Sequence, residues 1–241
     1  MTDKTVTLYF APHQDDELSN FGADICRTVS DGGRAVVYLC TNGAASGAKR
    51  LLRDGGKCVW HEGRHPARMD RETFIAARDA EFTESCLTLG VKPEDVRISD
   101  VRSEDGALTA EQARLIMLRA LAEFPGERVS VKTFAPVSFT RQNPDHTAAG
   151  SAALALYRAG AFSHPALFLE RIHMNEPGFP ADRCVRIAPR NEAETQRLRN
   201  AALAYRRYEP ARGRYAVGYH SVYDELADFY NAPYALLLKP E

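Results

Sequence analysis

Residues 6–22 read VTLYFAPHQDDELSNFG, and this stretch decides the fold class. It opens with the apolar run VTLYF at residues 6–10, which is typical of a buried strand. Apolar side chains then recur at helical spacing at Leu18, Phe21, Ile25 and Val29. A second apolar run, AVVYLC at residues 35–40, follows the helix. Strand, helix and strand in this order predict a βαβ unit with two parallel strands.

The rest of the chain continues this alternation. Further strands are expected at residues 96–99, 129–135, 165–169 and 184–187. Further helices are expected at residues 67–89, 109–123, 146–157 and 191–208. The pattern predicts an α/β fold, a Rossmann-like, doubly wound and mostly parallel sheet flanked by helices. We expect a single domain over residues 1–241, in which the aromatic tail, from about residue 205 to 241, packs on or near the functional site.

Composition and charge exclude several classes of function. The 241 residues include 31 basic and 32 acidic side chains, so the formal net charge of -1 gives no electrostatic case for a nucleic-acid partner. No apolar run approaches the roughly 18 residues that a membrane span requires. The N-terminus shows no signal-peptide pattern, and the five scattered cysteines predict reduced thiols. We therefore expect a cytoplasmic protein that acts on a small molecule, with homo-oligomerisation left open.

Three carboxylates in a row, Asp15, Asp16 and Glu17, stand at the predicted start of the first helix. The helix dipole stabilises an acidic residue at such a position by roughly 0.3–1 kcal/mol, which accounts for one or two of them. It accounts neither for the third carboxylate nor for His13. A histidine and a carboxylate three residues apart across a tight turn can converge on one divalent ion of the zinc type. The motif therefore predicts a metal site at the end of the first strand.

A second histidine in the same structural context is His146, in the segment QNPDHTAAG at residues 142–150. The segment follows the strand expected at residues 129–135 and begins a helix, so His146 is expected at the carboxyl edge of the sheet. The tripeptide NPD before it also suits a plain turn and helix N-cap. Together the two corners predict a metal site formed by His13, Asp16 and His146, with one coordination position open for water.

The segment HEGRH at residues 61–65 matches the H-E-x-x-H signature of zinc metalloproteases by letter. That signature requires both histidines on one face of a helix. Gly63 weakens a helix here, and Pro66 disfavours the helical conformation at His65. We therefore expect a loop in which His61 and His65 face solvent, rather than a protease site.

The motifs APHQDDE and NPDH together resemble those of the PIG-L/LmbE-like zinc-dependent deacetylases, whose usual forms are A-H-P-D-D-E and H-P-D-H. Weaker matches extend the resemblance over most of the N-terminal two-thirds: the loop TNGAASG, the segment RDAEFTESCLTLGV and the segment EDGALT. Members of this family remove the acetyl group from N-acetylated amino sugars. The resemblance implies a hydrolase acting on an N-acyl amino sugar or conjugate, with Zn²⁺ or another divalent transition metal as cofactor.

Residue by residue, the resemblance implies the same three metal ligands. It implies Asp15 as the general base that takes a proton from the attacking water. Arg78 and Asp105 match positions that bind sugar hydroxyls in relatives. For these two residues a surface ion pair is an equally good interpretation.

Two departures from the family motifs matter. Gln14 stands in place of the usual proline and is expected to change the rigidity of the turn. Asn143 stands in place of the first histidine of H-P-D-H; it can donate a hydrogen bond to an oxyanion but cannot act as an acid. We place Asn143 and Asp145 with Asp15 in the catalytic group.

The aromatic tail supplies one further candidate, His220, which we place among the substrate-binding residues. If the tail folds over the site, His220 could take the part in proton transfer that Asn143 cannot take. Other open pocket candidates are Tyr219, Tyr223 and Arg141. The rival interpretation is a non-catalytic sugar- or metal-binding relative of the same fold that has lost activity through Asn143. Asp15 beside a complete ligand set favours the enzyme.

Overall fold

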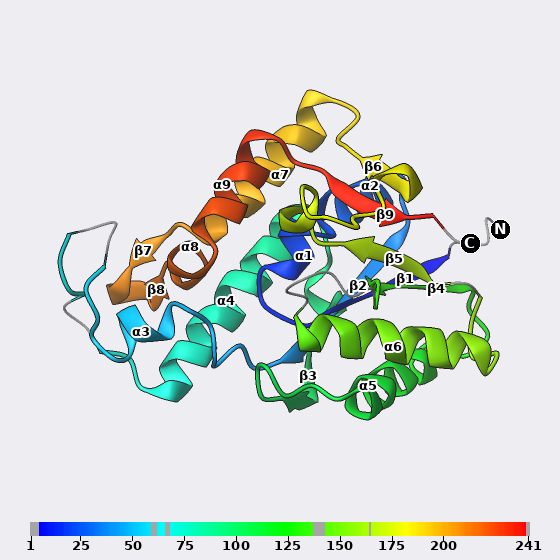
Figure 1. Cartoon of the computed structure of the whole chain (residues 1–241), viewed down its shortest axis with the longest axis horizontal. Coiled ribbons are helices and arrows are strands. Elements are labelled where there is room, and N and C mark those ends of the chain that lie inside the picture. The colour runs from blue at the N-terminus through cyan, green and yellow to red at the C-terminus, as the bar shows by residue number, and fades with distance from the viewer. Residues whose placement is uncertain (1–4, 59–61, 66–67, 137–142, 164, 240–241) are drawn as a thin grey trace.

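The computed structural model describes residues 5–58, 62–65, 68–136, 143–163 and 165–239 (Figure 1). Its strands are β1 (Val6–Ala11), β2 (Arg34–Thr41), β3 (Val96–Ser103), β4 (Val129–Phe134), β5 (Ala166–Leu169), β6 (Cys184–Ile187), β7 (Tyr208–Glu209), β8 (Arg214–Tyr215) and β9 (Ala235–Leu238). Its helices are α1 (Asp16–Ser19), α2 (Gly22–Ser30), α3 (Lys49–Leu52), α4 (Arg71–Leu89), α5 (Ala110–Ala122), α6 (Pro144–Arg158), α7 (Glu192–Ala204), α8 (Val217–Ser221) and α9 (Tyr223–Asn231). Among the described helices, none is long and apolar enough to cross a membrane.

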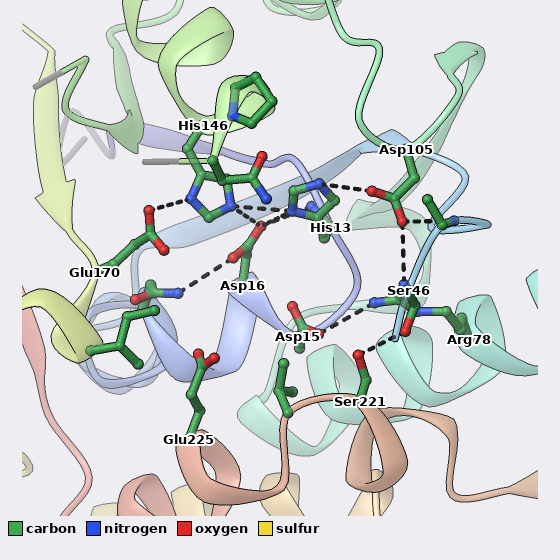
Figure 2. Close-up of a pocket in the computed structure, with 16 residues that line it drawn as sticks. His13, Asp15, Asp16, Ser46, Arg78, Asp105, His146, Glu170, Ser221 and Glu225 are labelled. Atoms are coloured by element: carbon green, nitrogen blue, oxygen red, sulfur yellow. Dashed lines mark hydrogen bonds and ion pairs between the residues drawn. The ribbon is translucent and has the colours of Figure 1, made fainter. Parts of the chain in front are cut away.

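The central sheet has seven strands in the order β3-β2-β1-β4-β5-β9-β6. Strands β1 to β5 pair in parallel, and β9 runs antiparallel to both of its neighbours. The predicted α/β class with a mostly parallel sheet flanked by helices is therefore confirmed. From β1 the chain moves outward through β2 to β3 and returns on the other side of β1 with β4. The carboxyl ends of β1 and β4 thus form the switch point at which such folds bind ligands, and His13 and His146 lie there (Figure 2).

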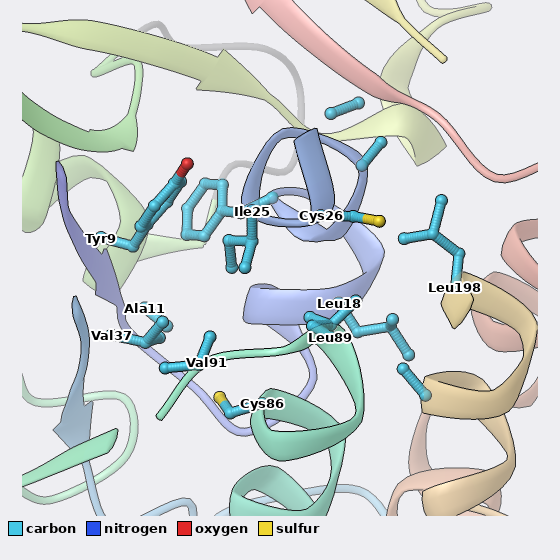
Figure 3. Close-up of a cluster of buried hydrophobic side chains, with 14 of the residues drawn as sticks. Tyr9, Ala11, Leu18, Ile25, Cys26, Val37, Cys86, Leu89, Val91 and Leu198 are labelled. Carbon is cyan, nitrogen blue, oxygen red and sulfur yellow. The ribbon is translucent and has the colours of Figure 1, made fainter. Parts of the chain in front are cut away.

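Alternate side chains of the central strands supply two hydrophobic cores, one on each face of the sheet. In β1, Leu8 and Phe10 pack in the core that α5 and α6 cover. Tyr9 and Ala11 pack in the opposite core, which α2, α4 and α7 cover (Figure 3). Because helices cover both faces, the open edge at the strand ends remains the place for a ligand.

The first helix differs from the prediction, because it is broken into α1 and α2. Asn20 and Phe21 separate the two. The Phe21 N–H reaches back five residues to the Asp16 carbonyl oxygen, which interrupts the regular hydrogen-bond ladder. The Phe21 ring is fully buried and lies 4.9 Å from the Phe134 ring, between centroids. The break leaves α1 as a separate short turn that carries Asp16.

Two predicted helices have different ends in the structure. Helix α4 begins at Arg71 rather than residue 67, since the Asp70 side chain caps it by accepting a hydrogen bond from the Thr73 N–H. Helix α7 ends at Ala204 rather than residue 208, because β7 and β8 pair as a hairpin directly after it.

The C-terminal tail does more than cover a surface. After α8 and α9, strand β9 enters the central sheet between β5 and β6. The sequence analysis expected no strand in this tail. The tail therefore completes the sheet and also places two helices beside the switch point (Figure 1).

Candidate active site

A pocket of about 470 Å³ lies at the switch point (Figure 2). Its walls come from the β1–α1 turn, the loop after β2, the first turn of α6, the end of β5 and the α8–α9 region. The sequence-predicted residues in its lining are His13, Asp15, Asp16, Arg78, Asp105, Asn143 and His146. Among the described residues that line it, Asp145 and His220 do not appear. The structure thus brings together most of the residues that the sequence singled out.

Three ligand atoms form a nearly equilateral triangle in this pocket. His13 Nδ1 lies 3.1 Å from His146 Nε2 and 3.3 Å from Asp16 Oδ2, and the last two atoms are 3.2 Å apart. All three side chains are buried. Ligand atoms about 2.0–2.1 Å from a tetrahedral metal ion are ~3.3–3.4 Å apart, so the triangle suits such an ion with almost no rearrangement. These three residues therefore fit a divalent metal ion.

A carboxylate holds the far nitrogen of each histidine. His13 Nε2 lies 3.0 Å from Asp145 Oδ2, and His146 Nδ1 lies 2.8 Å from Glu170 Oε1. Each carboxylate keeps a proton on the nitrogen that faces it, so the other nitrogen presents a lone pair to the triangle. Asp145 is itself held by two backbone N–H groups of the loop before α5. It therefore acts through His13 as a positioning residue, although the sequence placed it in the catalytic group.

The charges of the site favour a cation at the triangle. Burial lowers the pKa of His146, but the carboxylates of Asp16 and Glu170 outweigh burial and raise this pKa to about 9. Burial raises the pKa of Asp16, but His146 and His13 outweigh it and hold this pKa well below its usual range. Without a metal ion the triangle thus holds a positive charge beside an ionised carboxylate, and an ion that bound there would have to displace a proton.

The three consecutive carboxylates have different surroundings, so their charges are not crowded into one place. Asp16 belongs to the triangle. Asp15 lines the pocket, and burial raises its pKa to about 7 although Arg78 lies 3.3 Å away. Glu17 points into the core, where it accepts a hydrogen bond of 2.6 Å from the Tyr205 hydroxyl. Burial raises the pKa of Glu17 to about 8.

The backbone of Asp15 is strained. Its φ is 126° and its ψ is -28°, a region that favours glycine. Strain of this kind costs on the order of 1–3 kcal/mol and persists where the surrounding structure enforces it. It lets Asp15 and Asp16 face the same pocket, whereas consecutive residues of an extended strand would point to opposite sides.

Gln14, at the position of the family's proline, joins three segments. Its Nε2 donates to the Asn42 carbonyl oxygen at 3.2 Å and to the Asp79 carboxylate at 2.7 Å. Gly43 has a φ of 66°, and a Cβ at this position would lie 2.1 Å from Gln14 Oε1. Gln14 therefore fixes the turn after β1 against the loop after β2 and the first half of α4.

Arg78 is buried, at 3% exposure, so the interpretation as a surface ion pair is excluded for this residue. Its guanidinium donates to the carbonyl oxygens of Gly43 at 2.7 Å and Gln14 at 2.8 Å. A further hydrogen bond of 3.3 Å reaches the Asp15 carboxylate. Arg78 therefore holds Asp15 in place while it forms part of the pocket wall.

Asp105 and Asn143 also line the pocket. The Asp105 carboxylate lies 3.4 Å from His13 Nε2 and accepts a hydrogen bond from the Ala45 N–H. Asn143 caps α6, because its Oδ1 accepts a hydrogen bond of 2.9 Å from the Asp145 N–H. Since the oxygen of Asn143 is used by the cap, its NH₂ group is the part that can donate into the pocket.

The aromatic tail contributes three residues to the pocket: Ser221, Val222 and Glu225. The hydroxyl oxygens of Ser46 and Ser221 are 2.7 Å apart and join the loop after β2 to α8. Burial raises the pKa of Glu225 to about 8. Neighbouring carboxylates, Asp15 most of all, add a smaller effect in the same direction. The tail therefore reaches the site through residues that the sequence analysis did not name.

The other tail candidates lie elsewhere. The His220 ring faces away from the pocket, with its centroid 4.6 Å from that of His65. His65 is buried, so the expectation that it faces solvent was wrong.

Tyr219 and Tyr223 line a separate pocket of about 240 Å³ beside α7 and α9. Two further candidates lie outside the described residues: His61 and Arg141.

Sequence reasoning missed Glu170 and Glu225. Glu170 directly follows β5, so the rule that led to His13 and His146 would also have found it, had each strand end been searched for carboxylates. Glu225 reaches the pocket from a helix of the tail, and no sequence pattern connects it to the other residues.

The PIG-L family model, described as GlcNAc-PI de-N-acetylase, matches residues 8–157. The match spans both motif corners, from β1 to α6, and confirms the resemblance inferred from APHQDDE and NPDH. No curated protein matches the chain.

Solved structures share the fold at low sequence identity. One is teicoplanin deacetylase Orf2 in its zinc-inhibited form, with 17% identity and a TM-score of 0.65 over 97% of this chain and 96% of that chain. Another is N,N'-diacetylchitobiose deacetylase from Pyrococcus horikoshii, with 19% identity and a TM-score of 0.54 over 87% of this chain and 76% of that chain. A third is GalB, the 4-carboxy-2-hydroxymuconate hydratase from Pseudomonas putida KT2440, with 14% identity and a TM-score of 0.56 over 98% of this chain and 97% of that chain. These likenesses establish the fold, which serves more than one reaction.

Proposed function

The chain belongs to the PIG-L family, and from this membership we propose that it is a metal-dependent deacetylase acting on an N-acylated amino sugar or a related small amide. One observation carries the proposal: the triangle of His13, Asp16 and His146 shares its pocket with Asp15. The triangle suits a metal ion, and Asp15 has a pKa of about 7. A protein that only binds sugar has no need of a poised base beside such a triangle.

The donor set of two imidazoles and one carboxylate suits Zn²⁺ and leaves a position for water or substrate. When bound, such an ion would polarise the amide carbonyl and lower the pKa of a water molecule. Proton transfer and hydrogen bonding to the substrate fall to the chain's own residues, and four of these line the same pocket as the triangle. They are Asp15, Asp105, Asn143 and Glu225.

Asp15 takes the proton from the attacking water, since its carboxylate lines the same pocket as the triangle and is not part of it. Arg78 orients its carboxylate through the 3.3 Å contact. The NH₂ group of Asn143 donates a hydrogen bond to the amide oxygen as negative charge develops there. No covalent intermediate on the protein is needed for this reaction.

Glu225 supplies the proton that the missing histidine would have provided. Asn143 cannot act as an acid, whereas Glu225 lines the same pocket and has a pKa raised to about 8. It is therefore the group in this pocket that can give a proton to the departing amine. Asp15, after taking the proton from water, is the second donor in the pocket.

The remaining lining suits a hydroxylated substrate. Asp105 is partly exposed and can accept hydrogen bonds from hydroxyl groups. The Ser46 and Ser221 hydroxyls stand together at another part of the wall. Carboxylates and hydroxyls that converge on a polar pocket are the groups that recognise a sugar.

A screen of acetylated amino sugars and their conjugates tests the proposal. The metal-loaded protein is incubated with each compound, and the freed amine is detected; at least one compound is expected to be hydrolysed. The Asp15→Asn variant with the same metal content is the control for chemistry outside this pocket. Absence of amine from every compound, with metal bound at the triangle, would contradict the hydrolase and favour the non-catalytic alternative.

A further inference from the structure

A second group of metal-ligating side chains lies outside the pocket. Cys58 and His65 belong to the segment between α3 and α4, and His220 belongs to α8. One potential ligand atom from each lies within 4.8 Å of the other two. Cys58 is fully buried, and His65 and His220 are 9% and 7% exposed. Helices α3 and α8 gather with the β7–β8 hairpin at one end of the molecule, on the left of Figure 1.

The hydrogen bonding of His220 leaves its second nitrogen suited to a metal ion. His220 Nδ1 lies 2.6 Å from the Ala216 carbonyl oxygen. A carbonyl oxygen only accepts, so Nδ1 carries the proton and the Nε2 of the neutral ring presents a lone pair. That Nε2 atom is buried. A backbone carbonyl on the far nitrogen is the arrangement by which proteins orient metal-binding histidines.

His65 is oriented in a similar way. Its Nδ1 lies 3.3 Å from the Tyr208 hydroxyl oxygen, which can accept the Nδ1 proton. Its Nε2 atom is also buried. The His65 and His220 rings are nearly perpendicular, at 86°. Both imidazoles thus have a hydrogen-bonding group at Nδ1 and a buried Nε2.

The backbone of Cys58 is fixed by a hydrogen bond to another residue of the same loop. Its N–H donates to the Gly63 carbonyl oxygen at 2.6 Å, and the two residues form an antiparallel bridge. Glu62 has a φ of 50°, in the left-handed region that few residues other than glycine adopt. The bridge to Gly63 thus fixes the backbone of Cys58 within the loop that also carries His65.

The plain alternative is a packed interior in which Cys58 acts as a small apolar side chain and the two rings meet edge to face. Cys58 does pack in a small hydrophobic cluster that includes Phe74 and Val217. That packing accounts for the buried thiol. It does not account for the convergence of a thiol and two imidazoles, whose ligand atoms all lie within 4.8 Å of one another. Thiolate and imidazole are both ligands that zinc takes in proteins.

We propose that Cys58, His65 and His220 form a second metal site, which binds Zn²⁺ or another thiophilic divalent ion and has a structural role. Ligand atoms of a tetrahedral zinc ion lie ~3.3–3.8 Å apart, so the three atoms need to approach one another by no more than about 1.5 Å. A water molecule completes the coordination. This site goes beyond the proposed hydrolysis and does not depend on it.

The metal would fasten the segment before α4 to helix α8. Residue Ser221 follows His220 directly, lines the pocket and contacts Ser46 across it. A metal ion bound to His220 therefore stabilises one wall of the pocket without touching the substrate. Its loss is expected to loosen the pocket wall and lower thermal stability, and to leave the ligand triangle intact.

Cobalt substitution of the whole protein tests the proposal. A cobalt–thiolate bond gives a charge-transfer absorption in the near ultraviolet that imidazole and carboxylate ligands do not give. Among the groups of potential ligands that the described residues form, the one with Cys58 is the one that contains a cysteine. Wild-type protein is expected to show this absorption and to bind two ions per chain.

Three variants assign the signal. His146→Ala is expected to lose one ion and keep the absorption. Cys58→Ser is expected to lose the absorption and one ion while the triangle keeps its own. Cys184→Ser is the matched control: Cys184 is a partly buried thiol that donates to the Pro180 carbonyl oxygen, and this variant is expected to keep both ions and the absorption.

Folded wild-type protein that binds cobalt without this absorption would overturn the proposal, and so would an absorption that persists in Cys58→Ser. Circular dichroism shows whether Cys58→Ser is folded. If it is not, alkylation of wild-type protein followed by peptide mass spectrometry decides. Metal is then expected to protect Cys58, and a chelator is expected to restore its labelling. Equal labelling of Cys58 with and without metal contradicts the second site and leaves the proposed hydrolysis untouched.

Discussion

His13 Nδ1 and His146 Nε2 lie 3.1 Å apart although 133 positions separate them in the sequence. Their contact follows from the pairing of β1 with β4, in which residues 6–9 lie beside residues 129–132. Parallel neighbours end at the same edge of a sheet, so the turns that follow them meet. The Phe134 ring at the end of β4 stacks on His146 at 3.8 Å and fixes the plane of the imidazole. The geometry of the triangle is therefore set by the register of two central strands.

Replacing any corner of the triangle is expected to remove its metal. His13→Ala, Asp16→Ala and His146→Ala each leave two protein ligands, which hold a divalent ion far more weakly than three. Elemental analysis after dialysis is expected to show one ion per chain fewer than in wild-type protein measured in parallel. The assignment fails if all three variants keep the wild-type metal content.

Asp15→Asn is expected to keep its metal and lose turnover. The amide has the size of the carboxylate but cannot take a proton, and losing a general base costs on the order of 10²–10⁴-fold in rate. The kcat of the best substrate from the screen measures this, with metal content as the control. A kcat within a few-fold of wild type would remove Asp15 from the role of base.

Glu170→Gln is expected to weaken metal binding by about 10–100-fold, as for other carboxylates that orient a metal-binding histidine. The change removes the charge that holds the His146 imidazole at 2.8 Å and leaves the triangle's own atoms in place. Competition with a chromogenic chelator gives the affinity. Glu111→Gln, an exposed carboxylate paired with Arg114 on α5, is the matched control and is expected to change nothing. Equal affinities for the two variants would contradict the role of Glu170.

Asn143→His is expected to raise the rate of deacetylation, because it restores an acid beside the triangle. It also removes the cap of α6, so the free energy of unfolding is expected to fall by about 1 kcal/mol. Kinetics and urea unfolding of the same preparation separate the two effects. Hydrolysis by neither protein would support the non-catalytic alternative.

Glu81→Gln is expected to change how stability depends on pH. The Glu81 carboxyl accepts hydrogen bonds from the N–H groups of Val217 and Gly218 at 2.7 and 2.9 Å, and burial raises its pKa from 4.5 to about 8. The folded state therefore holds this proton more tightly than the unfolded chain. The resulting stabilisation is complete below about pH 4.5 and is lost as the pH rises through about 8.

Urea unfolding over this interval measures the effect. The free energy of unfolding of wild-type protein is expected to fall more steeply between about pH 6 and pH 8 than that of Glu81→Gln, which cannot titrate at this position. All other titrating groups are common to both proteins and cancel in the difference. If the free energies of unfolding of the two proteins changed with pH in parallel, the pKa of Glu81 would be the same in the folded and unfolded states.

The sequence singled out His13, Asp16 and His146, which the structure brings together, because each stands shortly after a strand or at the start of the next helix, in a short motif. Glu170 has the same placement without a motif. The role of Gln14 depends on Gly43 and Asp79, which belong to other segments, and no local pattern joins them. Strand β9 is a run of only four apolar residues, too short for its periodicity to distinguish strand from helix.

The direction of a side chain, as His220 shows, is a second property that could not be predicted from the sequence. The sequence placed it near the pocket, and its neighbour Ser221 is indeed there. Consecutive residues of an α-helix point about 100° apart, so the same helix that brings Ser221 to the pocket turns the His220 ring toward His65. Such directions follow from how α8 packs, which depends on residues of α4 far away in the sequence.

Strand β9 lies between β5 and β6, although the ribosome makes it after both. Until β9 emerges, one edge of β5 is unpaired, and β6 has no neighbour to join. Glu170, which clamps His146, stands at the end of that incomplete strand. Metal loading is therefore expected to follow synthesis of the C-terminal segment rather than accompany translation. Nascent chains stalled before residue 235 are expected to bind no metal at the triangle of His13, Asp16 and His146, and metal binding there by such chains, lost in His146→Ala, would show that the centre matures earlier.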